Sequence, residues 1–256
     1  MLMLDTPAAS CYIATGQLTG PLVHYAHPEV PLYITFYAHA SFRLEADGLA
    51  VITDPYTPGP DGSGFDPINE PADLVIMSST TDRFHSDPTH ITGSPVIIDA
   101  LALPLTGEEV NGVPIRPFPA MENLNHDFGR DPDANAMYLF TIGGLRFLHM
   151  GDIGNPIEPD QLDALRGQVD ILLALAGGRA TIALDALDDA IAAIGPRVII
   201  PMHYYSSRGV LNILPVDDFL GRHPAAMITR VGTPHLELTP ATLPATTQIY
   251  LLEQSR

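Results

Sequence analysis

The stretch of residues 144–154, GLRFLHMGDIG, constrains the fold of this chain more than any other part of the sequence. Side chains alternate along residues 145–150 with the period of two that is typical of a β-strand. The strand then stops at Gly151 and Gly154, which hold Asp152 between them. A carboxylate at the end of a buried strand needs a partner, because an unpaired charge is costly there. Two interpretations of Asp152 stay open, a cap for the next helix or a side chain facing a group that the glycine turn approaches.

The second half of the chain repeats this arrangement. Apolar runs at residues 169–175 and 198–201 predict buried strands, which end at a Gly-Gly pair and shortly before His203. Helices are predicted at residues 159–165 and 184–194, the second closed by a glycine and a proline. This half therefore reads strand, helix, strand, helix, strand. In layered α/β folds, polar side chains that follow such strands gather where functional sites form.

The first half reads as a hairpin followed by a further strand. Residues 33–37, 41–45 and 49–53 predict strands, with Asp47-Gly48 as a turn and Asp54 where the third strand stops. A long loop rich in proline and glycine follows at residues 57–71, and such loops commonly border functional sites. Residues 74–77 form a short buried strand, and the polar run 78–87 comes directly after it. The remaining predicted elements are strands at 96–101, 113–117, 136–142, 227–231 and 247–252 and a helix at 216–220.

Charge and composition exclude several classes of partner. The 256 residues include 30 acidic and 12 basic side chains, all of the latter arginine, which gives a net charge of −18. Such a charge repels nucleic acid and anionic membrane surfaces. No apolar run is long enough to cross a membrane, so we expect a soluble, cytoplasmic protein whose partner is a small-molecule substrate. Whether the chain forms a homo-oligomer stays open.

Histidines and aspartates recur at the predicted strand ends or in the loops beside them. The set is Asp54, His85, His126, Asp152 and His203. Cys11 is the only cysteine, so a thiolate cluster is excluded. Imidazoles and carboxylates without thiolates are ligands that suit zinc, manganese or iron.

Five motifs in order resemble the metallo-β-lactamase fold superfamily, and more closely its lactonase-like branch of metal-dependent hydrolases. They are FYAHASF (36–42), ITDPY (52–56), HMGDIG (149–154), GG (177–178) and IPMHY (200–204). The resemblance implies an αββα sandwich of two mixed sheets with helices outside. We expect one such domain over residues 1–256, with residues 1–31 as an N-terminal extension of unclear role.

The resemblance also implies roles for individual residues. Asp54 matches the family's structural aspartate, Asp152 the carboxylate that bridges two metals, and His203 the late histidine ligand. His126 matches the middle histidine best. His39, His149 and Tyr204 are predicted to be structural or to support the ligands, with His149 orienting Asp152 and Tyr204 lining the substrate pocket.

One motif departs from the family. After the strand at 74–77 the family carries His-x-His-x-Asp-His, whereas this chain has Ser79 and Thr81 in place of the first two histidines. Hydroxyls are poor ligands for these ions, so the first metal position should be weak or empty. Asp82 and His85 can supply the rest only if the turn is reshaped. The predicted metal ligands are therefore His85, His126, Asp152 and His203, and the predicted catalytic residues are Asp82, His85 and Asp152.

Two functions follow from this site. In the first, one divalent ion, with zinc before manganese or iron, activates a bound water for hydrolysis of a small ester-like substrate, a lactone being the first choice. In the second, the metal is lost and the fold survives as a catalytically inactive binding or scaffold protein. Nothing in the sequence separates a lactone from a thioester or a phosphodiester.

Overall fold

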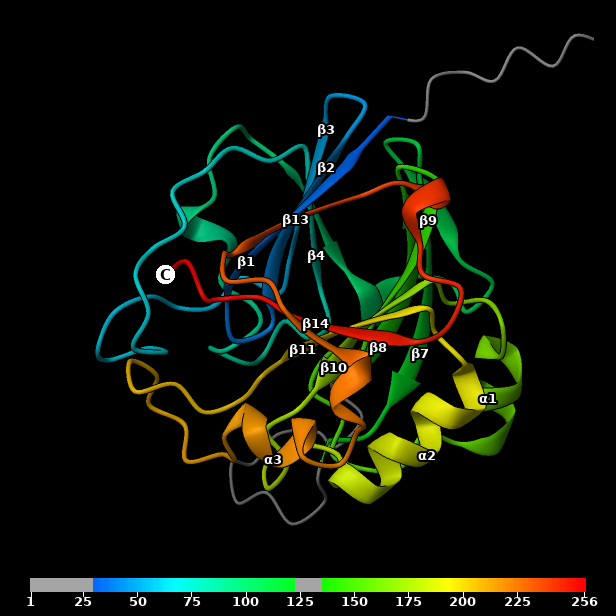
Figure 1. Cartoon of the computed structure of the whole chain (residues 1–256). Helices are drawn as coiled ribbons and strands as arrows, with labels where there is room; N and C mark the ends of the chain where they lie inside the picture. The colour runs from blue at the N-terminus through cyan, green and yellow to red at the C-terminus, as the bar shows by residue number, and fades with distance from the viewer. Residues whose placement is uncertain (1–29, 123–134) are drawn as a thin grey trace, which may run out of the picture.

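A computed structural model describes residues 30–122 and 135–256, which form two mixed β-sheets packed face to face (Figure 1). The first sheet has the strand order β13 (His235–Leu238), β1 (Leu32–Ala38), β2 (Ser41–Ala46), β3 (Leu49–Thr53), β4 (Leu74–Met77) and β5 (Val96–Asp99). The second has the order β12 (Ile228–Arg230), β14 (Gln248–Leu251), β11 (Val198–Met202), β10 (Ile171–Leu175), β9 (Leu145–His149), β8 (Asn135–Ile142), β7 (Val113–Ala120) and β6 (Glu108–Val110). The predicted sandwich of two mixed sheets is confirmed.

The parallel strands decide where polar side chains meet. Strands β9, β10 and β11 run parallel, with Leu173 opposite His149 and Leu175 opposite Met202. Their carboxyl ends therefore reach one edge of the sheet. In the first sheet, β1, β2 and β3 are antiparallel, while β3, β4 and β5 are parallel.

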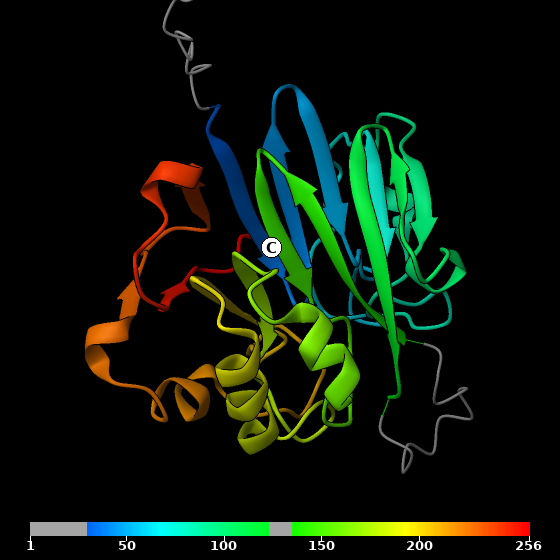
Figure 2. The same cartoon turned by 90° about the vertical axis from the view of Figure 1, so that its right-hand side faces the viewer.

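Helices α1 (Pro159–Leu165), α2 (Leu184–Ile194) and α3 (Val216–Leu220) lie beside the second sheet, away from the first (Figures 1 and 2). Helix α2 buries Leu187, Ile191 and Ile194 at helical spacing and ends at Gly195, whose φ of 69° lies in the left-handed region that favours glycine. The sequence predicted the bounds of all three of these helices.

Loops rather than helices cover the outer face of the first sheet. Alternate strand residues point outward, among them Tyr37, Ile52 and Val75, and they pack with Tyr56 and Phe65 of the loop that follows β3. Strand β4 is consequently buried on both faces. The proline- and glycine-rich loop thus supplies the apolar cover that a helix supplies elsewhere.

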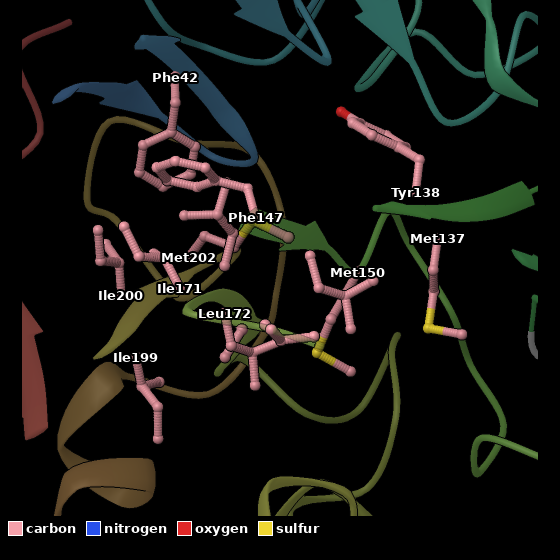
Figure 3. Close-up of a cluster of buried hydrophobic side chains, with 14 of the residues drawn as sticks. Phe42, Met137, Tyr138, Phe147, Met150, Ile171, Leu172, Ile199, Ile200 and Met202 are labelled. Carbon is pink, nitrogen blue, oxygen red and sulfur yellow. The ribbon is translucent and has the colours of Figure 1, made fainter. Parts of the chain in front are cut away.

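The opposite strand residues fill the space between the sheets. Phe42 of the first sheet shares one buried cluster with Phe147, Ile171 and Ile200 of the second (Figure 3). The same cluster extends through the second sheet to helix α2. Close packing of this kind fixes the relative position of the two sheets, and so of the strand ends described below.

The structure adds two strands to those predicted. Strand β6 is only three residues long and largely exposed, and β13 is half-exposed, so neither has the apolar run that indicates a strand. Of the extension predicted at residues 1–31, all but residues 30 and 31 lies outside the described part of the chain. Among the described residues, no helix is long and apolar enough to cross a membrane.

Candidate metal centre

Three strand ends bring two histidines against one carboxylate. Asp152 follows β9, His203 follows β11, and His85 lies in the turn after β4. The Nε2 atom of His85 lies 3.5 Å from Oδ2 of Asp152, and the Nε2 atom of His203 lies 3.4 Å from Oδ1. Both imidazoles are buried, and the side chain of Asp152 is 12% exposed. The carboxylate thus lies between two histidines at the mouth of a buried site.

His39 completes the group from the link between β1 and β2. Its ring centre lies 4.0 Å from that of His203 and 5.0 Å from that of His85, and its carbonyl accepts a 2.7 Å hydrogen bond from the His203 amide. His39, Asp54 and His203 all have positive φ angles, of 58°, 38° and 53°. Such backbone is strained by about 1–3 kcal/mol per residue and persists only where its surroundings enforce it. The fold therefore forces these side chains into the site.

The donor atoms fit a metal ion. Within the described residues, Nε2 of His39, Nε2 of His85 and Nδ1 of His203 are buried and have no hydrogen-bond partner. The ligand atoms of His39, His85 and His203 lie within 4.8 Å of one another, as do those of Asp82, His85 and Asp152. Zinc bonds of about 2.0–2.1 Å in a tetrahedron place neighbouring ligands roughly 3.4 Å apart. The 3.5 Å between Nε2 of His85 and Oδ2 of Asp152 matches that spacing.

The protonation of His85 supports this assignment. Its Nδ1 lies 2.9 Å from Oδ2 of Asp54, and because a carboxylate only accepts, Nδ1 carries the hydrogen. The Nε2 atom then faces the carboxylate of Asp152, so a proton or a cation has to lie between them. Burial lowers the pKa of His85, but the neighbouring carboxylates of Asp152 and Asp54 outweigh it and raise the pKa well above its usual range. A bound divalent ion would take the place of that proton.

Burial favours the neutral form of the other two histidines. Burial, reinforced by the neighbouring imidazoles, lowers the pKa of His39 well below its usual range. Burial also lowers the pKa of His203, against the charge of Asp152. A neutral imidazole keeps the lone pair that a metal ligand needs.

The buried carboxylate of Asp54 supports the site through hydrogen bonds. It is fully buried and accepts hydrogen bonds from the amide and hydroxyl of Ser78 at 2.8 and 2.6 Å, from Nδ1 of His85, and from the hydroxyl of Tyr138 at 3.0 Å. Burial opposes its ionised form, but the nearby His149 ring and the bonds from His85 and Ser78 hold its pKa below the usual range. The sequence indicated Asp54 but not Tyr138, which sits inside β8 and has the pattern of an ordinary core residue.

His149 orients the turn rather than the carboxylate of Asp152. Its Nδ1 accepts the amide hydrogen of Gly151 at 3.0 Å, so its Nε2 carries the hydrogen that it donates to the carbonyl of Ala40 at 2.8 Å. A Cβ on Gly151 would lie 2.6 Å from Oδ1 of Asn135, and that same oxygen accepts the Asp152 amide. The turn needs glycine because of this close approach. The helix-cap interpretation of Asp152 is wrong, since residues 153–158 are not helical.

The segment that departs from the family's His-x-His-x-Asp-His motif forms a tight turn. The hydroxyls of Ser79 and Thr81 lie 3.1 Å apart and hydrogen-bond to each other. Asp82 accepts the amide of Phe84 at 2.7 Å, and its carbonyl accepts the amide of His85 at 3.2 Å. This tight turn brings Asp82 and His85 to Asp152, as a reshaped turn had to do. His126, the remaining predicted ligand, lies outside the described residues.

A small pocket opens beside His39. Its volume is about 10 Å³, room for about one water, and its walls include Phe84, Tyr204 and, from the long loop after β3, Ser63 and Phe65. Tyr204 thus lies in the wall, where it was expected.

Comparison with known proteins decides the family. A family model described as the β-lactamase superfamily domain matches residues 33–203. The chain belongs to the metallo-β-lactamase superfamily. A crystal structure of a superfamily member from Thermotoga maritima is 30% identical, with a TM-score of 0.67, and the match covers 88% of this chain and all of that one.

Curated relatives of this metallo-β-lactamase superfamily chain include proteins described as UPF0173 metal-dependent hydrolases. The one from Thermococcus onnurineus is 24% identical over 190 residues, and the one from Carboxydothermus hydrogenoformans is 28% identical over 192. Each match covers 67% of this chain and 84% of the relative.

Proposed function

We propose that this chain is a metal-dependent hydrolase of a small ester-like substrate, a lactone being the first choice, with one ion per chain. The observation that carries the proposal is the unpartnered Nε2 of His85, aimed at Asp152 across 3.5 Å among the described residues. The descriptions of the relatives support the reaction class, and that of the Thermotoga maritima protein names zinc. Manganese and iron suit the same ligands.

The residues divide into ligands and supports. His85, Asp152 and His203 would hold the ion, with His39 or Asp82 completing its shell; His126 stays a predicted ligand. When bound, a divalent ion lowers the pKa of water and polarises an ester carbonyl. Asp54 fixes the His85 ring through Nδ1. Buried Asp82, held by the amide of Phe84, is the carboxylate placed to accept a proton.

A metal-free binding protein is the second candidate. The mutual hydrogen bond of Ser79 and Thr81 favours it, because those hydroxyls occupy the positions of two family ligands. In that case the proton on His85 would be permanent, and the site would be held by hydrogen bonds alone.

Metal analysis and a substrate screen separate the two candidates. Protein purified without added metal should contain up to one zinc, manganese or iron ion per chain, measured by elemental analysis. Lactones, thioesters and phosphodiesters should then be screened with each of these metals supplied, and we expect hydrolysis of a lactone. Absence of bound metal together with inertness towards every substrate class would overturn the proposal in favour of the binding protein.

A further inference from the structure

Two arginines beside the pocket have no acidic partner among the described residues. In the described part of the chain, seven arginines form ion pairs with carboxylates. Four others do not, although the sequence holds 30 acidic residues. Two of those four, Arg83 and Arg179, adjoin segments that line the pocket next to the metal centre. In a chain of net charge −18, paired arginines are the expectation, so this placement needs a reason.

Arg83 lies between two walls of the pocket. Its guanidinium carbon is 4.8 Å from the centre of the Phe84 ring, and that ring is in turn 5.5 Å from the ring of His39. The only hydrogen bond from its guanidinium to the described residues is a 3.4 Å contact with the carbonyl of Asp61, two residues before the pocket residue Ser63. A guanidinium has five N–H donors, so most of those on Arg83 are available to a ligand. The cation–π contact holds its plane against the aromatic wall.

Arg179 lies against a different wall. It follows the glycines after β10 with a φ of 46°, which lies in the left-handed region. Its Nη1 makes a 3.5 Å contact with the side-chain oxygen of Asn212, between the pocket residues Leu211 and Ile213. By contrast Arg208, on the same segment, is paired with Asp66. The pocket is thus flanked by two cations whose charge no described carboxylate neutralises.

We propose that the preferred substrate carries an anionic oxygen group, a carboxylate or a phosphate, which Arg83 and Arg179 bind at the rim while its ester faces His39 and Asp152. The inference rests on the proposed function, since it concerns the substrate of that site. Guanidinium groups bind such anions through paired charge-assisted hydrogen bonds.

A charge-matched pair of substrates tests this. The ratio of kcat/KM for a carboxylate-bearing lactone over its methyl ester should fall about tenfold in Arg83→Gln and in Arg179→Gln, since each variant loses a charge-assisted hydrogen bond. Arg116→Gln is the matched control, because its guanidinium carbon also lies 4.8 Å from the centre of a phenylalanine ring, that of Phe118, and it also has no described acidic partner. It should leave the ratio unchanged. A phosphate-bearing lactone, run in parallel, tells the two anions apart. Equal ratios in wild type and both rim variants would overturn the proposal.

A binding measurement keeps the test independent of catalysis. Titration calorimetry should show that butanoate, or inorganic phosphate, binds the purified protein more tightly than neutral butanamide, and that Arg83→Gln removes this preference while Arg116→Gln keeps it. Coordination of the anion by a bound ion would survive in both variants, and that result would contradict the arginine rim. If Arg83→Gln loses the preference for the anion but the protein hydrolyses no substrate, the result would support anion binding by the arginines and refute the proposed hydrolase function.

Discussion

The two ends of the parallel strands β9, β10 and β11 differ in whether their polar side chains are paired within the chain. At the end where the strands begin, Arg146 donates to both carboxylate oxygens of Asp170 at 2.9 Å, and Arg197 donates to the carbonyls of Leu243 and Pro244. At the end where they finish, the described histidines keep nitrogens without partners. The same buried sheet supports both ends.

This difference indicates which end contributes to stability and which end is available to bind a ligand. A buried polar group without a partner costs free energy, so a fold keeps one only where something else is gained. The starting end satisfies its charges within the chain. The finishing end holds imidazoles and a carboxylate at metal-ligand spacing, which the core beneath it makes rigid. The predictions below test that division.

The largest effect is expected from replacing the carboxylate at the finishing end. Asp152→Asn should lower metal affinity and activity by more than the roughly 10–100-fold that follows loss of a supporting hydrogen bond, because the proposed ligand itself is lost. Metal content by elemental analysis and hydrolysis of the best substrate measure this. Asp170→Asn is the matched control at the starting end. If both variants bind metal like the wild type, the proposed division between the ends fails.

A smaller loss is expected from Gly177→Ala. An added Cβ would lie 2.1 Å from the carbonyl oxygen of His203, so the backbone that carries this proposed ligand has to move. We expect metal affinity to fall about 10–100-fold, as for other changes in ligand orientation, measured by competition with a chelating dye.

Gly167→Ala is the counterpart near the start of β10. That residue has a φ of 67° and nothing within 4 Å of an added Cβ, so the change should cost about 1–2 kcal/mol of stability through backbone strain alone. Unfolding in urea should show this cost while metal affinity stays the same. Equal metal affinity in the Gly177 and Gly167 variants would show that His203 is not a ligand.

Asp170→Asn should reduce stability moderately. We expect a loss of about 1–2 kcal/mol at pH 7, since the pair with Arg146 is charge-assisted but half-exposed and so partly screened. Burial raises the pKa of Asp170, but hydrogen bonds and the charge of Arg146 outweigh it and hold the pKa below its usual range. The pair therefore stabilises the fold above the unfolded pKa of about 3.9 and loses its effect as the pH falls through the folded pKa. The difference in the free energy of unfolding between variant and wild type, measured in urea, should therefore shrink as the pH falls. A difference independent of pH would contradict this account.

The smallest expected change is at most a doubling of metal content. Ser79→His combined with Thr81→His would restore two family ligands at the turn after β4, and elemental analysis should rise from about one ion towards two. Two tightly held ions in the unaltered protein would show that Ser79 and Thr81 are misaligned with those ligands.

Much of the fold could be predicted because its signals are local. The hairpin turn at Asp47-Gly48, the apolar period of α2 and the glycine that ends it each depend on neighbours in sequence. Strands β6 and β13 could not be predicted, because they are held by pairing with β7 and β1 rather than by an apolar run.

The sequence by itself determined the residue types of the candidate site and the strands that carry them. Asp54, Asp152 and His203 are recognisable because each follows a strand directly or within a few residues. Only the tertiary structure decided that His39 joins His203 and His85, because the link between β1 and β2 meets the end of β11 across two sheets. It also brought the hydroxyl of Tyr138 into hydrogen-bonding distance of Asp54. Contacts between residues 84 to 164 positions apart follow from sheet packing, and no local pattern encodes them.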